Sequence, residues 1–576
     1  MLTSKSRHTF NTLLDSVALK SDDDTQDAIV YVATGQEPIH VSRRAFREFV
    51  TAYAVGLRAM GIGPQDLVII AHTQNLESVY AFWGAMLIGA VPSMFTTLTE
   101  KLDPDIYMRN MAELVDLSAV RAVLTTDEFA PILAAQVSCP VYGSQQLADI
   151  VANADIDGFG KRFKSLTAAV ASLSTAVSSK TAFLQHSSGT TGLQKGVALA
   201  HDAVLNQLAA YSDALALTAQ DVVVSWLPLY HDMGLIAGFL LPLVQGIPLV
   251  LMSPFDWVSH PVLLLNAIQA HSGTLCWLPN FAYNHCARRI RRRDLAGVSL
   301  ATMRLFINCS EPVRHDSHEL FLERFASLGV KREMLGVSYA MAENTFAVTQ
   351  TVPGEAVKLD TVDRFALETD LVARPLPQDD PQATVKVSCG SPIAGTAVHV
   401  LDKNNQILPE RHVGELAVQS NCMLTEYYRR CDLDPFHAGW YLTGDMGYVV
   451  DGEVYVVGRS KDLIINAGKN VYPQDIEAII NTVPGVHAGR AVVFGVPDKR
   501  EGTELIAVVA EVHAVDLDER KAINKKIRQE VARQSAVTVS YVQLVDAKWL
   551  VKTSSGKIAR AANRDKWLLS RKRLAS

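Results

Sequence analysis

Short apolar runs alternate with amphipathic segments through most of the first 350 residues. The run at 67–70 is followed by an amphipathic segment at 76–88 and then by another apolar run at 90–92. Further runs of the same kind stand at 122–124, 222–226, 274–277 and 303–307. Runs this short are typical of strands, and the longer amphipathic segments are typical of helices. This order predicts parallel sheets that helices cover on both faces.

The pattern changes near residue 385 to short strands of alternating polarity. These strands lie at 398–401, 415–418 and 453–457, and the pair Asp451-Gly452 supplies a turn. They predict a small β-barrel-like unit. After Gly458 a new α/β unit begins, with helices expected at about 473–481 and 517–535 and strands at 490–494 and 505–512.

One uncharged stretch, residues 234–252, is nineteen residues long and so reaches the length of a membrane span. It contains Pro242, and its step Gly246-Ile247-Pro248 is a turn signal. We therefore expect a buried helix up to about residue 244, a turn, and a buried strand at 249–251. No membrane span is expected.

Composition and charge narrow the class of protein. The chain has 576 residues, so about three or four folding units are expected. Hydrophobic residues make up 48% and charged residues 20%, as in ordinary globular proteins, and the net charge of −6 gives no global attraction to nucleic acid. The one basic cluster, at 288–293, is short and lacks interleaved aromatics, which favours a solvated helix end over a polyanion-binding patch.

The seven cysteines are scattered, and no two form a Cys-x-x-Cys pair. This pattern predicts reduced, buried thiols in a cytoplasmic protein, without a zinc site or a disulfide framework. The N-terminal residues include Lys5, Arg7 and Asp15 before any apolar run develops, so no signal peptide is expected.

The segment at 186–196, which we call the phosphate loop, carries the strongest chemical signal. It reads HSSGTTGLQKG, with three glycines, four hydroxyl residues and Lys195. Inward-facing amides, hydroxyls and one lysine suit the phosphates of a nucleotide. It is not a P-loop, because the Gly-Lys-Ser/Thr ending is missing. A solvated linker is the alternative, but such a linker would not usually separate apolar runs like 182–184 and 197–200.

Five more motifs follow the phosphate loop in order: WLPLYHDMG at 226–234, NCSEP at 308–312, SYAMAE at 338–343, YLTGD at 441–445 and KTSSGKIAR at 552–560. Together they resemble the adenylate-forming superfamily of acyl-CoA synthetases, fatty acyl-AMP ligases, peptide-synthetase adenylation domains and firefly luciferase, over nearly the whole chain. The resemblance implies an α/β fold. A large N-terminal AMP-binding domain (1–458) would hold two doubly wound sheets and the small β-barrel-like subdomain. A hinge (459–462) and a small, mobile α+β C-terminal domain (463–576) would follow.

The resemblance also implies roles for residues of the acyl and phosphate sites. His231 would lie near the substrate carboxylate, at the mouth of an acyl pocket lined by Trp226, Met233, Ile236 and Leu278. A histidine satisfied within a packed segment is the alternative. The phosphates would be held by Ser187, Ser188, Gly189, Thr190, Thr191 and Gly192.

For the adenosine, the resemblance implies a turn of Ser310, Glu311 and Pro312 against the adenine, and the segment Tyr339, Ala340, Met341 and Ala342, whose tyrosine ring covers it. Asp445 would accept from the ribose hydroxyls, and Arg459 would contact ribose or phosphate. Glu343 and Thr190 would hold Mg²⁺, which prefers oxygen ligands and substrate phosphates. Without the other motifs, Tyr339 would be read as core and Glu343 as a solvated helix residue.

The C-terminal part supplies a second glycine-flanked lysine, Lys557, some 360 residues after Lys195. In the family, the C-terminal domain rotates about a hinge position, here Lys461, and a loop matching Gly468 then lines the tunnel for the thiol. A carboxylate that attacks ATP must approach an anion, so cations are needed around the transition state. Lys195, Lys557 and Mg²⁺ would supply them, and with His231 and Glu343 they form the predicted catalytic set.

Several features favour fatty acyl-AMP ligases within the superfamily. Residues 471–477 (VYPQDIE), 253–256 (SPFD) and the extra segment at 354–387 resemble theirs, whereas 91–97 and Val471 depart from their pattern. The expected reaction uses ATP to convert a fatty or related hydrophobic acid to acyl-AMP, releasing pyrophosphate. The acyl group then passes to the phosphopantetheine thiol of a holo acyl carrier protein, or to CoA. A luciferase-like oxygenase and a non-catalytic, nucleotide-binding scaffold are less favoured, and a monomer or homodimer is expected.

Overall fold

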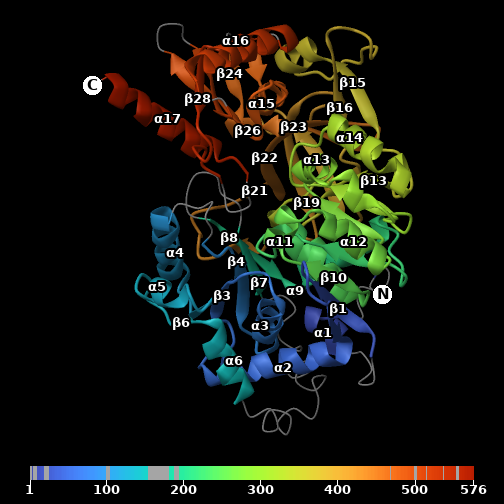
Figure 1. Ribbon diagram of the computed structural model, residues 1–576, viewed down its shortest axis with the longest axis vertical. Helices are drawn as coiled ribbons and strands as arrows, with labels where there is room; N and C mark the ends of the chain where they lie inside the picture. Colours follow the sequence, from blue (N-terminus) through green and yellow to red (C-terminus); the bar gives the residue numbers. More distant parts are fainter. Residues whose placement is uncertain are drawn as a thin grey trace.

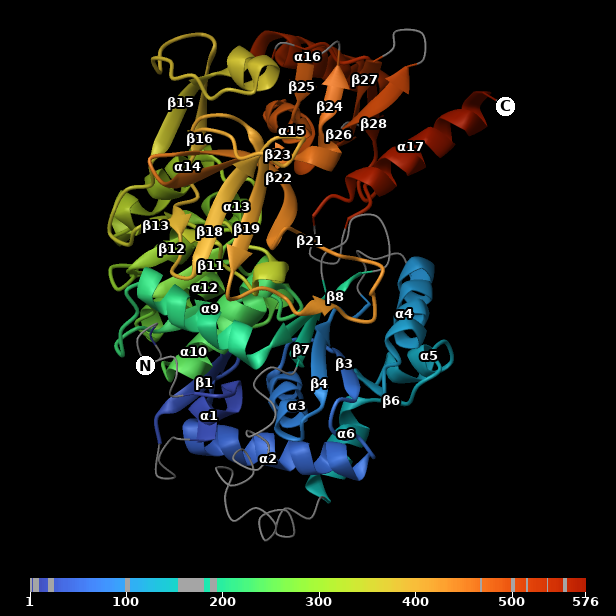
Figure 2. The same cartoon turned by 180° about the vertical axis from the view of Figure 1, so that it is seen from behind.

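The computed structural model describes residues 3, 10–18, 25–98, 104–153, 181–186, 194–466, 469–498, 503–513, 516–535, 537–552 and 557–575. The C-terminal part, orange to red, lies at one end of the long axis, and the helices α2 (Arg43–Ala59) and α3 (Leu76–Leu87) lie at the other (Figures 1 and 2). Between these ends stand two seven-stranded sheets and one antiparallel sheet. The predicted α/β fold is confirmed.

The first sheet has seven strands, all parallel except the edge pair β1–β2. In spatial order these are β13 (Leu335–Val337), β12 (Leu305–Asn308), β11 (Leu275–Leu278), β9 (Val223–Ser225), β10 (Leu249–Met252), β1 (Asp27–Val32) and β2 (Ile39–Ser42). Strands buried on both faces read as continuous apolar runs, which explains why the sequence pattern located β9 to β12.

The second sheet also has seven strands, parallel at one end and antiparallel at the other. In spatial order these are β20 (Glu426–Tyr427), β8 (Gly196–Ala200), β7 (Thr181–His186), β4 (Val91–Phe95), β3 (Leu67–Ala71), β5 (Ala122–Thr125) and β6 (Val141–Tyr142). The phosphate loop joins β7 to β8, so it is the connection of an antiparallel hairpin and departs from the predicted parallel pattern.

Helices cover these sheets, and their ends follow the sequence. They are α1 (Leu13–Ala18), α2, α3, α4 (Pro104–Ser118), α5 (Ala130–Ala134), α6 (Ser144–Ala152), α9 (His201–Ala214), α10 (Leu241–Gln245), α11 (Pro254–Ser259), α12 (Val262–Ala270), α13 (Asn280–Arg289) and α14 (His315–Phe325). Helix α3 begins where Asn75 accepts from the amide of Ser78 at 2.9 Å. A Cβ on Gly84 would stand 2.9 Å from the Ala54 nitrogen, so α2 and α3 pack this closely only because position 84 is glycine.

Residues 234–252 fold as the sequence predicts. A π-helix, η2 (Met233–Leu240), continues into α10, Gly246 turns the chain at φ 71°, and the buried strand β10 follows. The π-helical form of the first half is not signalled by the apolar pattern. Among the described residues, no helix has both the length and the apolar character needed to cross a bilayer.

The predicted β-rich unit is a five-stranded antiparallel sheet of β18 (Thr396–Leu401), β19 (Gly414–Ser420), β21 (Phe436–His437), β22 (Trp440–Val450) and β23 (Glu453–Arg459). The predicted turn at Asp451-Gly452 joins β22 to β23, with both residues at positive φ. Two short pairs accompany it: β14 (Thr349–Gln350) with β17 (Ser391–Pro392), and β15 (Leu359–Asp363) with β16 (Ala383–Val387).

The C-terminal part has its own core. The strands β26 (Val486–Asp498), β27 (Thr503–Val512) and β28 (Tyr541–Val545) form one sheet, and β24 (Ile464–Asn466) pairs with β25 (Lys469–Val471). Helices α15 (Pro473–Asn481), α16 (Leu517–Gln534) and α17 (Arg560–Ala575) complete it. Two apolar clusters, separate from the main core, fill this part. Helix α17 extends outward from it in both views (Figures 1 and 2).

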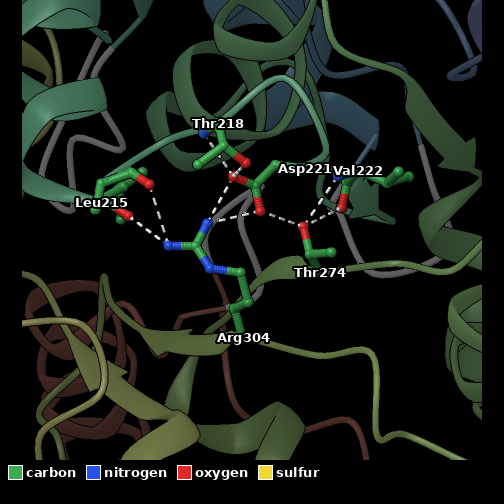
Figure 3. A network of polar contacts seen from close by, with 7 residues as sticks. Leu215, Thr218, Asp221, Val222, Thr274 and Arg304 are labelled. Atoms are coloured by element: carbon green, nitrogen blue, oxygen red, sulfur yellow. Dashed lines mark hydrogen bonds and ion pairs between the residues drawn. The ribbon is translucent and has the colours of Figure 1, made fainter.

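An ion pair between a buried aspartate and a half-buried arginine ties three parallel strands to the end of α9 (Figure 3). The Asp221 carboxylate accepts from Arg304 at 2.7 and 2.6 Å and from the Thr274 hydroxyl at 2.7 Å. Arg304 also donates to the Leu215 carbonyl at 3.1 Å. Burial opposes ionisation of Asp221, but hydrogen bonds from Arg304, Thr218 and Thr274 outweigh it and lower its pKa.

The seven cysteines are free thiols, and five of them are buried, as the sequence predicts. The prediction of burial is wrong for Cys431, which is exposed, and Cys139 is half-buried. The cluster at 288–293 is confirmed as a helix end: α13 stops at Arg289, and all five arginines are exposed.

Candidate functional site

The two ends of the phosphate loop are held by strand pairing. His186 at the end of β7 pairs with Gly196 at the start of β8, and Nδ1 of His186 lies 2.8 Å from the Ser93 hydroxyl on β4. Burial lowers the pKa of His186 to about 4, so this imidazole is neutral at pH 7. The predicted phosphate ligands lie outside the described residues, and their role stays a prediction: Ser187, Ser188, Gly189, Thr190, Thr191 and Gly192.

Lys195, the last side chain of the phosphate loop, stands over an aromatic ring. Its Nζ lies 4.6 Å from the ring centroid of Tyr427, and the Tyr427 hydroxyl donates to Glu343 at 2.9 Å. The hydroxyls of Tyr427 and Tyr441 are 3.1 Å apart. The structure therefore brings Lys195, the predicted cation, and Glu343, a predicted Mg²⁺ ligand, into contact with the same tyrosine. The sequence analysis did not single out Tyr427.

Glu343 is one of the two predicted protein ligands of Mg²⁺; the other, Thr190, lies outside the described residues. Its Oε1 accepts from Tyr427, and in the described part of the chain its other carboxylate oxygen makes no hydrogen bond. No group of three or more His, Cys, Asp or Glu residues that could hold a metal occurs among the described residues. One carboxylate oxygen beside a phosphate-binding loop fits Mg²⁺, which is usually held by one or two carboxylates together with substrate phosphates.

The predicted ribose and adenine residues meet at one place. The Tyr339 hydroxyl donates to Oδ2 of Asp445 at 2.7 Å, and Nε of Arg459 donates to Oδ1 at 3.0 Å. Tyr339 follows β13, whereas Asp445 and Arg459 pair across β22 and β23. The carboxylate is thus fixed between two donors that sequence position alone would leave far apart.

The turn after β12 carries backbone strain. Ser310 has φ 70°, which is uncommon for a residue with a side chain. Its hydroxyl points to the Met233 sulfur at 3.8 Å, so the predicted adenine turn touches the predicted acyl pocket. Glu311 accepts from the Phe281 amide at 2.8 Å, and the next residue, Pro312, is exposed. Ala340, Met341 and Ala342 continue the chain from Tyr339 to Glu343, half-buried.

His231 has a charged partner that the sequence analysis missed. Its Nδ1 lies 2.6 Å from Oδ1 of Asp232. This buried carboxylate accepts from the Met233 amide at 2.8 Å. Burial opposes ionisation of Asp232, but His231 and then the charge of Lys557 outweigh it and lower its pKa. The sequence did offer a signal for this pair, because Asp232 directly follows His231 in the HDMG motif.

Aromatic rings gather around Trp226, which precedes His231 in the same motif. Trp226 stacks on Trp257 with centroids 3.6 Å apart and rings 10° from parallel, and Phe281 meets both rings edge-on. The remaining predicted pocket residues, Met233, Ile236 and Leu278, are buried. Trp257 and Phe281 were missed because they come from α11 and α13, outside the motif. We call Trp226, Trp257 and Phe281 the aromatic wall; that it lines an acyl pocket stays a prediction.

Lys557 comes from the C-terminal part yet acts on the N-terminal site. Its charge is among the causes that lower the pKa of Asp232. Burial raises the pKa of Glu311, and the Phe281 amide, Lys557 and Lys552 partly counter that rise. The charge of Lys557 thus reaches two residues of the N-terminal part, and its catalytic role stays a prediction.

The predicted hinge is a short 3-10 turn, η8 (Ser460–Asp462), directly after β23. Lys461 lies in this turn and is exposed. Arg560 donates to Asp462 and to Glu477, each at 2.7 Å, and so joins the hinge to the lysine motif. Gly468, the predicted tunnel residue, lies outside the described residues.

Comparison with known families decides which class of protein this geometry belongs to. The family of AMP-binding enzymes matches residues 20–428, and the C-terminal domain of AMP-binding enzymes matches residues 475–557. The chain belongs to the AMP-binding enzymes. The resemblance drawn from the motifs is thereby confirmed, and the protein is a ligase of the adenylate-forming superfamily.

Relatives of this AMP-binding enzyme, and solved structures similar to it, include fatty acyl-AMP ligases. The medium-chain-fatty-acid–[acyl-carrier-protein] ligase JamA of Moorena producens is 30% identical, over 98% of this chain and 96% of its own. A long-chain-fatty-acid–AMP ligase of Mycobacterium bovis is 29% identical, over 96% and 95%. A structure from a study of fatty acyl-adenylate ligases of E. coli and L. pneumophila aligns with a TM-score of 0.84 at 26% identity, covering 97% of both chains.

A hairpin of this AMP-binding enzyme touches its C-terminal domain. The segment at 354–387 forms β15, the short π-helix η7 (Ala366–Asp370) and β16. Arg364 donates to the Gln534 carbonyl, Asn470 donates to the Glu368 carbonyl at 3.0 Å, and Lys386 lies 3.5 Å from Asp475. Lys469 also lies over the ring of Phe365, 5.8 Å from its centroid. Together these contacts join the hairpin to the C-terminal domain, which follows the hinge.

Proposed function

We propose that this enzyme uses ATP to convert a fatty or related hydrophobic carboxylic acid to acyl-AMP, with release of pyrophosphate. It then transfers the acyl group to the phosphopantetheine thiol of a holo acyl carrier protein. The observation that carries this proposal is the carboxylate of Asp445, which accepts from both Tyr339 and Arg459 although the three residues come from separate segments of the chain. Lys557, whose charge reaches Asp232 and Glu311, would add a second cation to Lys195 for a reaction between two anions.

Each site residue has a proposed role that follows from its position. His231, whose Nδ1 lies 2.6 Å from Asp232, would orient the acid's carboxylate. Lys195 and Lys557 supply positive charge to the in-line transition state and to the leaving pyrophosphate. Tyr339 and Arg459 fix Asp445 to accept from the ribose hydroxyls. Glu343, with Thr190, would hold Mg²⁺, which neutralises phosphate charge when bound.

The aromatic wall and the relatives support a hydrophobic acid as substrate. The stacked Trp226 and Trp257 with Phe281 form an apolar cluster in the part of the chain that carries the His231 motif. Curated relatives are named for medium-chain and long-chain fatty acids. A structure of an L. pneumophila fatty acyl-adenylate ligase with acyl adenylate and pyrophosphate aligns at 26% identity with a TM-score of 0.72.

The acceptor proposal draws on the hairpin at 354–387. Its contacts with Gln534, Asn470 and Asp475 restrain the C-terminal domain. This domain would have to rotate about the hinge before a thiol could reach the acyl-AMP. One relative is named for transfer to an acyl carrier protein. A putative acyl-CoA synthetase of Caulobacter vibrioides, 28% identical over 94% of this chain, keeps CoA as the second candidate. The free, mostly buried thiols suit a cytoplasmic enzyme.

Pyrophosphate release tests the first half of the proposal. The full chain, with ATP and Mg²⁺, is offered hydrophobic acids of increasing chain length, with amino acids as the comparison. Acid-dependent release for hydrophobic acids alone is expected. Release with amino acids and not with fatty acids would contradict the substrate class. Thioester formation with CoA and with holo carrier protein, measured in parallel, then decides the acceptor.

A further inference from the structure

The segment at 424–428 ties two parts of the nucleotide site together through its backbone. The amide of Leu424 donates to the Glu343 carbonyl at 2.8 Å, and the amides of Thr425 and Tyr428 donate to the carbonyls of Ala198 and Gly196 on β8 at 2.9 and 2.7 Å. The short strand β20 and the residues that flank it thus bond to the segment of Glu343 on one side and to β8, at the exit of the phosphate loop, on the other.

Tyr427 lies within the segment at 424–428, and it is only 4% exposed. Its ring lies under the ammonium of Lys195, 4.6 Å from Nζ to the centroid. A lysine over an aromatic face gains from the ring quadrupole, and more so where water is excluded. The ring therefore limits where the phosphate-loop lysine can point.

The hydroxyl of the same tyrosine acts on the other charged group. It donates to Oε1 of Glu343 at 2.9 Å and lies 3.1 Å from the Tyr441 hydroxyl. A neutral donor bound to one carboxylate oxygen fixes the direction of the other, which is the one left for a cation. Lys195 and Glu343 are 148 positions apart in the chain, yet the side chain of Tyr427 contacts both.

We propose that Tyr427 is a positioning residue that holds Lys195 and Glu343 at a fixed separation, so that the β- and γ-phosphates of ATP and their Mg²⁺ are bound together. The proposal depends on the proposed function for the identity of the nucleotide. It goes beyond that function by assigning the coupling of lysine and carboxylate to a residue outside the recognised motifs.

Two substitutions separate the ring from the hydroxyl. Tyr427→Phe keeps the face under Lys195 and removes only the donor to Glu343, and Tyr427→Leu removes both. The measurement is equilibrium binding of Mn²⁺ to the full chain in the presence of α,β-methylene-ATP, followed by electron paramagnetic resonance. Nucleotide binding at saturating Mn²⁺ is measured by calorimetry. Tyr428→Phe is the matched control, since its ring lies next to Arg429.

Tyr427→Phe is expected to weaken Mn²⁺ binding about ten-fold, the loss typical for one hydrogen bond to a charged group, with nucleotide affinity at saturating Mn²⁺ unchanged. Tyr427→Leu is expected to weaken nucleotide binding about five-fold as well, as loss of the cation–π contact requires. In a Glu343→Gln background, Tyr427→Phe is expected to have a smaller effect, because the two residues act as one pair.

Mn²⁺ binding by Tyr427→Phe that equals wild type would overturn the proposal. So would equal losses in Tyr427→Phe and Tyr428→Phe, or a loss in Tyr427→Phe that Glu343→Gln leaves undiminished. These results concern nucleotide and metal only. Failure of the wild type to release pyrophosphate with any hydrophobic acid would instead reject the proposed substrate, and the two failures are therefore distinguishable.

Discussion

His231 and Asp232 show how a few side chains prepare the site for an anionic reaction. Asp232 lies 2.6 Å from the imidazole, and its lowered pKa keeps it ionised at neutral pH even though it is buried. A negative charge at this depth would repel a substrate carboxylate if nothing balanced it. Lys557, whose charge reaches Asp232, supplies part of that balance only when the C-terminal domain is in place.

The Lys557→Ala variant tests this dependence at the residue scale. We expect acyl-AMP formation to fall about 10²–10³-fold, since one preorganised charge is lost from the transition state. Thioester formation from pre-made acyl-AMP is expected to stay near the wild-type rate, because no pyrophosphate leaves in that step. Single-turnover assays of the two half-reactions make the comparison.

Lys525→Ala provides the control for this variant, because Lys525 is exposed on α16 away from the site. It is expected to leave both half-reactions unchanged. Equal losses of the two half-reactions in Lys557→Ala would show that the lysine maintains the fold or the thiol step instead of serving adenylation.

Single residues also show where the sequence analysis reached its limit. Lys195, Glu343, Asp445 and Lys557 could be found because each stands in a recognisable motif. Tyr427 could not, since its importance comes from contacts with residues 84 and 232 positions away. Contacts of this kind depend on strand register, which a single sequence does not specify.

At the scale of elements, the apolar pattern located the strands that are buried on both faces. Strands β3, β5, β11 and β12 fall within one or two residues of the expected runs. The pattern gave no sign that β8 runs antiparallel to β7, because direction depends on the loop between them. It also gave no sign of the π-helical form of η2, since an apolar helix reads the same with either hydrogen-bond spacing.

The ion pair of Asp221 and Arg304 fixes the register of these parallel strands (Figure 3). Removing the cation in Arg304→Ala leaves a carboxylate that is 1% exposed without its main partner. We expect a loss of about 3 kcal/mol in the stability of the N-terminal domain, as for other broken buried pairs. The measurement is the midpoint of urea unfolding followed by tryptophan fluorescence.

Arg293→Ala is the control, because its pair with Asp294 at 3.6 Å lies in solvent and its side chain is 73% exposed. A change below about 0.5 kcal/mol is expected there. The lowered pKa of Asp221 adds a pH signature. Its contribution is present above the unfolded pKa of about 3.9 and is lost as the pH falls toward the lower folded value. Indistinguishable midpoints for the two arginine variants would contradict the structural role.

At the scale of the whole molecule, the hairpin at 354–387 and the C-terminal domain share a titratable interface. Burial, reinforced by the charge of Asp475, raises the pKa of Glu368 to about 7, and Arg364, Lys386 and Lys469 counter part of that rise. A carboxyl with a raised folded pKa binds more protons in the folded state. Its interface is therefore favoured at low pH and weakened as the pH rises from about 4.3 through about 7.

We expect the urea midpoint of the C-terminal domain to fall between pH 5.5 and pH 8 more steeply in the wild type than in Glu368→Gln, which cannot ionise. Glu410→Gln, an exposed carboxylate away from the interface, is expected to follow the wild type. Parallel pH profiles for wild type and Glu368→Gln would show that Glu368 does not govern docking.

The domain organisation illustrates what sequence resemblance adds to periodicity. Strand and helix patterns divided the chain near Arg459, where β23 ends and the turn η8 begins. They did not indicate that the charge of Lys557 would reach Asp232. Contacts across the hinge, such as that of Arg314 with the Gln474 carbonyl at 2.7 Å, join the two parts.

The most direct test is a crystal structure of the full chain with a non-hydrolysable fatty acyl-adenylate mimic. The account predicts the ribose on Asp445, the adenine against Tyr339, the acyl phosphate mimic within reach of Lys195 or Lys557, and the chain beside Trp226. A nucleotide bound away from Asp445, or an acyl chain on another face of the molecule, would contradict it.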